Sequence, residues 1–73
     1  MAHRVREMAA AHQELRNYCV SLSYLMPTES HRGFFLRCAF FWEKEAQLLR
    51  NAAACLEESA KLLTEAADAL PGN

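Results

Sequence analysis

Apolar residues recur at seven-residue intervals along the C-terminal half of the chain. One series has large side chains: Phe35, Trp42, Leu49, Leu56, Leu63 and Leu70. A second series lies four residues after each of the first five members and consists of alanine: Ala39, Ala46, Ala53, Ala60 and Ala67. Alternating steps of four and three residues keep both series on one face of an α-helix. Because residues 34–70 contain no Gly or Pro, the pattern predicts one helix over about residues 31–70, on the order of 55 Å long.

The alternation of large and small side chains resembles the alanine-rich antiparallel coiled coils of many helical bundles, in which small residues let two helices approach closely. A further apolar stripe lies one residue before the first: Phe34, Phe41, Leu48, Cys55, Leu62 and Ala69. The apolar face is therefore wider than one partner helix can cover, and two or more neighbouring helices are expected.

A shorter helix is predicted over about residues 3–25. Its apolar positions also alternate in steps of three and four: Val5, Met8, His12, Leu15, Cys19, Leu22 and Met26. Pro27 biases the residue before it away from helical geometry, and Thr28 or Ser30 can cap the start of the next helix. The chain has only two valines and no isoleucine, so strands are not expected. These patterns predict a single all-α domain, a helical hairpin spanning residues 1–73.

The two predicted helices differ in length, and this difference predicts a dimer. Folded back along the long helix, the short one reaches to about residue 55, so that Leu56, Leu63 and Leu70 lack a partner. Leaving such leucines in water costs roughly 1.5–3 kcal/mol each, and a second antiparallel chain would cover them in a homodimeric four-helix bundle. The predicted dimer interface consists of Phe35, Trp42, Leu49, Leu56, Leu63, Leu70, Ala53, Ala60 and Ala67. The alternative is a monomer in which a kink near Asn51 folds the remaining residues back as a third helix.

Charge and cysteine content refine this picture. The net charge is −1, so nucleic acid is not expected as a partner, although residues 1–37 are net basic and residues 38–73 net acidic, which favours antiparallel pairing. Three cysteines, an odd number at wide spacing, form neither a closed disulfide framework nor a zinc motif. We therefore expect reduced thiols in a cytoplasmic protein. The apolar run over residues 38–42, which no other run exceeds in length, is far too short to cross a membrane.

Candidate chemistry is sparse. His12 lies on the apolar stripe of the first helix, seven residues from Cys19. Two helical turns separate them by roughly 10 Å, too far for a nucleophile and its base. No other arrangement of catalytic residues is recognisable, so we expect no enzyme activity, no cofactor and no metal.

A contact surface for another protein is the better hypothesis. Phe40 points away from the main apolar stripe, with Arg37 and Lys44 near it on the same helix, and it is the first candidate for an exposed partner contact. Tyr24 and Arg32 flank the loop and complete the predicted partner-binding residues.

These features favour a small non-enzymatic protein–protein interaction module that dimerises and binds, and could inhibit or regulate, a larger partner protein. Small bacterial or phage-encoded accessory proteins that inhibit a regulator have a similar size and form, an analogy at the level of the fold alone. Two other hypotheses stay open at this point. One is a structural oligomerisation unit without a separate ligand, and the other is a metal- or small-molecule-binding bundle that uses His12 and the cysteines.

Overall fold

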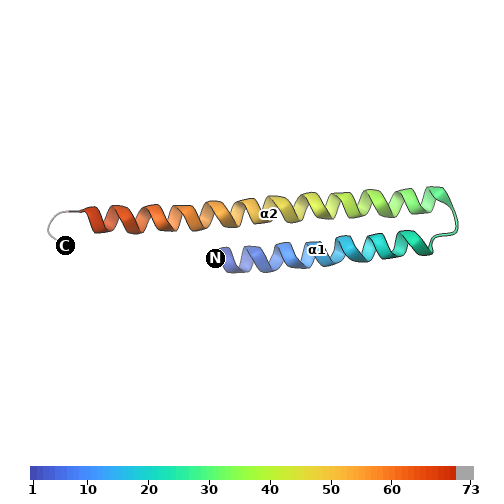
Figure 1. Cartoon of the computed structure of the whole chain (residues 1–73), viewed down its shortest axis with the longest axis horizontal. Coiled ribbons are helices and arrows are strands. Elements are labelled where there is room, and N and C mark those ends of the chain that lie inside the picture. The colour runs from blue at the N-terminus through green and yellow to red at the C-terminus, as the bar shows by residue number, and fades with distance from the viewer. Residues whose placement is uncertain (71–73) are drawn as a thin grey trace.

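Two antiparallel helices make up the molecule (Figure 1). The computed structural model describes residues 1–70, in which α1 spans Ala2–Leu25 and α2 spans Glu29–Ala69. No strand occurs in this part of the chain, and the predicted all-α helical hairpin is confirmed. Because α2 continues unbroken through Asn51, the kinked three-helix alternative is not the fold adopted.

The turn between the helices is fixed by local chemistry. Met26 adopts an extended conformation with ψ 137°, as expected for a residue that precedes proline. The side-chain oxygen of Thr28 accepts a hydrogen bond from the backbone N–H of His31 at 3.3 Å, which caps one of the free donors at the start of α2. Thr28 is thus the cap rather than Ser30, and α2 begins at Glu29, two residues earlier than predicted.

The contact between the helices is made of small side chains. Ala46 and Ala53 are both 0% exposed, and the other buried apolar residues of the chain are also small: Ala9, Cys19 and Ala39. Side chains of this size let the two backbones approach closely. The larger residues of the same stripe, such as Trp42 and Leu49, are half-buried beside the alanines.

The face that α1 turns toward α2 includes Val5, His12 and Cys19 of the predicted stripe, which are buried or half-buried, but it departs from that stripe at two positions. Met8 and Leu15 were expected to point inward, but they are 51% and 42% exposed. Ala9 and Ser23 are buried in their place, because small side chains suit the close approach set by the alanines of α2. The buried hydroxyl of Ser23 donates a hydrogen bond to the Val20 carbonyl at 2.6 Å, so its polar group is satisfied.

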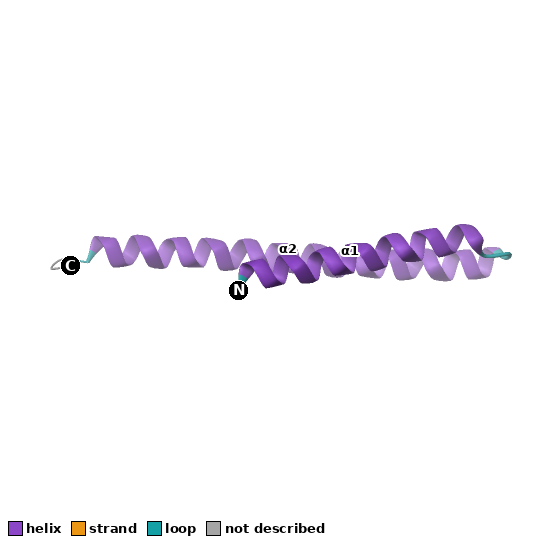
Figure 2. Cartoon of the chain, turned by 90° about the horizontal axis from the view of Figure 1, so that it is seen from below, coloured by secondary structure: helices purple, strands orange, loops and turns teal. Residues whose placement is uncertain are grey.

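The helices are unequal in length, and α2 extends well past the N-terminus of α1 (Figure 1). An ion pair between Arg6 and Glu57 joins the helices near the N-terminus of α1. Beyond it the side chains of α2 are exposed, Leu63 at 72%. The whole molecule is a rod of 70 × 14 × 10 Å, in which α1 crosses α2 at a shallow angle (Figure 2). We refer to residues 58–70 as the overhang.

Candidate interaction surfaces

His12 is a structural residue at the edge of the helix contact. Its Nδ1–H donates to the Met8 carbonyl at 2.7 Å, and its ring meets that of Trp42 edge-on, with 5.1 Å between centroids. No group of three potential metal ligands lies together within residues 1–70. The three cysteines are free thiols: Cys19, Cys38 and Cys55.

The residues of the predicted dimer interface fall into two sets. Those that lie alongside α1 already contribute to the contact within one chain: Phe35, Trp42, Leu49 and Leu56 are half-buried and Ala53 is fully buried. Those of the overhang are exposed: Ala60, Leu63, Ala67 and Leu70. The stripe predicted as one continuous interface is therefore covered by α1 over its first part and uncovered over its last.

A second apolar stripe runs along the whole of α2. Its large members are all more than half exposed: Phe34, Phe41, Leu48 and Leu62. Small side chains lie between them in steps of three and four residues: Cys38, Ala52, Ser59 and Ala66. A shallow hollow near the middle of α2 is lined by Phe41, Lys44, Glu45, Gln47 and Leu48. We call this stripe, with Glu45 and Cys55, the outer seam.

The other helix carries an exposed apolar stripe too. On α1 it comprises three residues of the predicted stripe and their neighbours three residues further along the helix: Met8, Ala11, Leu15, Tyr18, Leu22 and Leu25. Of these only Leu22 is half-buried. The seven-residue spacing of these side chains is visible in the sequence. They are exposed because α1 is rotated about its axis relative to the orientation that the sequence predicts.

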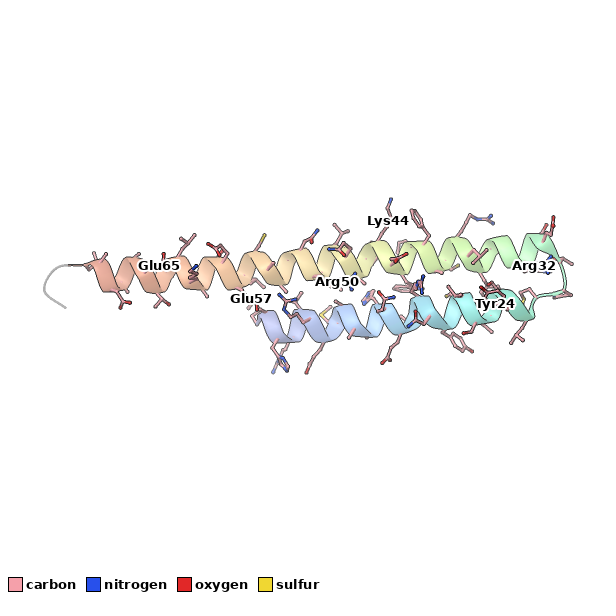
Figure 3. All side chains as sticks on the ribbon, viewed as in Figure 1. Tyr24, Arg32, Lys44, Arg50, Glu57 and Glu65 are labelled. Carbon is pink, nitrogen blue, oxygen red and sulfur yellow. The ribbon has the colours of Figure 1, made fainter. Side chains whose placement is uncertain are left out.

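The predicted partner-binding residues lie at two separate places. On α2, Phe40 is 60% exposed and the Lys44 ammonium lies 5.0 Å from the centre of its ring, a cation–π contact. Lys44 points away from α1 (Figure 3), and Arg37 is exposed. Tyr24, 81% exposed, and Arg32 lie instead at the loop end of the hairpin, on different helices (Figure 3). We call Arg37, Phe40 and Lys44 the Phe40 patch.

Comparison with known proteins adds no further information about these surfaces. No protein-family model, curated protein or solved structure matches the chain. Within residues 1–70, neither helix has an apolar stretch long enough to cross a lipid bilayer.

Proposed function

We propose that this protein is a non-enzymatic protein–protein interaction module that forms a homodimeric helical bundle and binds a larger partner protein, whose activity it regulates or inhibits. The observation that carries the proposal is the contrast between a core of alanines and a surface of leucines and phenylalanines. The chain buries Ala46 and Ala53 completely while Leu48 and Leu63 are 61% and 72% exposed. Free thiols at all three cysteines suit the reducing cytoplasm, where we place the protein.

Energetics supports self-association. Covering one exposed leucine or phenylalanine stabilises the buried state by roughly 1.5–3 kcal/mol. A single core in a chain of this size contributes only about 3–5 kcal/mol. Burying even Leu48, Leu62 and Leu63 against another chain therefore contributes as much as the whole intrachain core.

The Phe40 patch supports binding of a different protein. An exposed aromatic ring with a cation held over it supplies both apolar area and charge, and such residues are common energetic anchors of interfaces. Phe40 lies on neither of the two apolar stripes of α2. It therefore stays accessible when those stripes are covered.

Sedimentation equilibrium at micromolar concentration tests self-association. We expect a mass of twice the 8.3 kDa chain, because the exposed stripes are covered in the assembled form. A mass of 8.3 kDa at all accessible concentrations would contradict the homodimer.

Affinity purification with Phe40→Glu tests partner binding. We expect this variant to keep its helix content and its mass in solution but to lose a protein that copurifies with the native chain. Phe40→Leu, which keeps an apolar side chain at the same position, is the matched control and should retain it. Identical sets of proteins for the native chain and Phe40→Glu would instead favour a structural oligomerisation unit without a separate ligand.

A further inference from the structure

Charged side chains beside the outer seam change sign along α2. At seven-residue intervals the positions are basic, basic, neutral, acidic and acidic: Arg37, Lys44, Asn51, Glu58 and Glu65. The order is antisymmetric about Asn51. A second copy that runs antiparallel, with its own Asn51 at the same level, therefore presents acidic residues to basic ones and basic residues to acidic ones. In antiparallel coiled coils, charges that flank the seam in this way set partner choice and orientation.

None of these charges forms an ion pair within residues 1–70. The ion pairs there are His3–Glu7 and Arg6–Glu57, and Lys61 lies one turn from both Glu58 and Glu65 without pairing with either. Arg37, Glu58 and Glu65 are all exposed. Lys44 contacts only the ring of Phe40, an interaction that leaves its ammonium free to approach a carboxylate.

Side-chain size is compatible with the register that charge sets. When the two α2 helices lie antiparallel with each Asn51 near its counterpart, each large residue of the outer seam comes opposite a small one of the second copy, in pairs centred on residue 50, one residue from Asn51. The pairs are Phe34 with Ala66, Phe41 with Ser59, Leu48 with Ala52, and Leu62 with Cys38. The single charged residue of the seam, Glu45, comes opposite Cys55. A shift of one heptad in either direction still sets large residues opposite small ones, such as Phe41 opposite Ala52 or Ala66, but it places Glu45 against Leu48 or Leu62. The position of Glu45, and not side-chain size, therefore disfavours the shifted registers.

The same alignment gives the overhang a place to lie. The His12–Trp42 contact fixes how α1 lies along α2. From that level, residues 56–70 of the second copy run beside about residues 11–25 of α1 and parallel to them. The exposed stripe of α1 then meets the alanine–leucine stripe of the second copy. Three pairs set a large residue opposite a small one, namely Leu15 with Ala60, Leu22 with Ala67, and Ala11 with Leu56, whereas Tyr18 with Leu63 and Leu25 with Leu70 are pairs of large residues.

We infer that two copies of this chain pair through their outer seams, antiparallel about Asn51, with each overhang lying against the exposed stripe of α1 of the other copy. Arg37 then faces Glu65 of the second copy, and Lys44 faces its Glu58, so that of the Phe40 patch the ring of Phe40 is left for a different partner. The inference rests on the proposed self-association and specifies its surface. Much of the interface predicted from sequence, the stripe that includes Trp42 and Leu49, is instead used within one chain.

Two charge-reversal variants, one of the basic residues and one of the acidic residues of the series, test the register. One variant is Arg37→Glu with Lys44→Glu, and the other is Glu58→Lys with Glu65→Lys. Each puts like charges opposite one another at four places per dimer, so each alone should dimerise about ten- to a hundredfold more weakly than the native chain. An equimolar mixture of the two should form a heterodimer with nearly native affinity, since every pair is again opposite in sign.

A matched control separates the register from net charge. Arg4→Glu with Arg32→Glu changes the charge as much as the first variant, but at exposed positions outside the outer seam and its flanking charges. It should dimerise within a few-fold of the native chain. All proteins are compared by sedimentation, with circular dichroism to establish equal helix content.

Three results would overturn the register. In the first, the native chain dimerises but the two reversal variants dimerise equally well. In the second, both variants are weakened and the mixture does not recover. In the third, only Glu58→Lys with Glu65→Lys tightens the dimer, as expected if two acidic overhangs pair tail to tail. A native chain that stays monomeric instead contradicts the proposed self-association itself, which keeps the two failures distinguishable.

Discussion

Enlarging one alanine of the helix contact is expected to damage the fold more than most changes elsewhere. Ala46 is 0% exposed and lies in the contact between α1 and α2 with other small residues. Ala46→Leu adds three carbon atoms where no space exists, so the helices must separate or the new side chain must leave its preferred rotamer. Overpacking of this kind costs about 1–3 kcal/mol. Leu and Ala have nearly equal helix propensity, so the effect reports on the contact and not on α2 itself.

Urea unfolding followed by circular dichroism at one fixed protein concentration measures this cost. With an unfolding slope of about 1 kcal/mol per molar urea for a small protein, the midpoint of Ala46→Leu should fall by about 1–3 M. The matched control is Ala54→Leu, because Ala54 is exposed on the same helix and surface substitutions usually change stability by less than about 0.5 kcal/mol. Equal midpoints for Ala46→Leu and the native chain would refute the claim that a close alanine contact holds the hairpin together.

Two further changes probe other parts of the molecule. Thr28→Ala removes the hydrogen bond to the His31 N–H and should lower the free energy of unfolding by about 1 kcal/mol. Thr28→Ser keeps the capping oxygen and should lower it far less. An equal loss of stability in both variants would rule out the cap as the cause. Cys55 is exposed in the single chain and belongs to the outer seam. Its reaction with iodoacetamide, followed by mass spectrometry, should therefore become slower as protein concentration rises. A reaction rate that does not change across the concentration range of dimerisation would place Cys55 outside the interface.

The helices and the overhang were predictable from sequence because they depend on regular features. Residues 34–70 contain no helix breaker, and the seven-residue repeat spans all of them. The length of α1 is bounded by Pro27, so the excess length of α2 follows directly. The start of α2 was placed two residues late because Thr28 and Ser30 are both good capping residues, and only the structure shows which one accepts the hydrogen bond.

The rotation of α1 was not predictable in the same way. Sequence reasoning places the largest apolar residues, such as Met8 and Leu15, in the core, because burial of apolar area is the dominant stabilising term. In this hairpin the fully buried positions between the helices hold only small side chains, so Ala9 and Ser23 occupy two of them. The residues of α2 thus determine which face of α1 packs against them. This is a tertiary effect that cannot be read from the apolar pattern of α1 alone. The same rotation exposes the stripe that the overhang of a second copy can use.

The uninterrupted course of α2 also sets a length scale. A helix of 41 residues holds its ends about 60 Å apart, and without Gly, Pro or a kink beyond Gly33 it resists bending. The loop end, with Tyr24 and Arg32, and the tip of the overhang are therefore held at a nearly constant separation. Two proteins bound at the two ends of α2 would therefore be held at a fixed separation. In that case the molecule would serve as a spacer in addition to providing a binding surface.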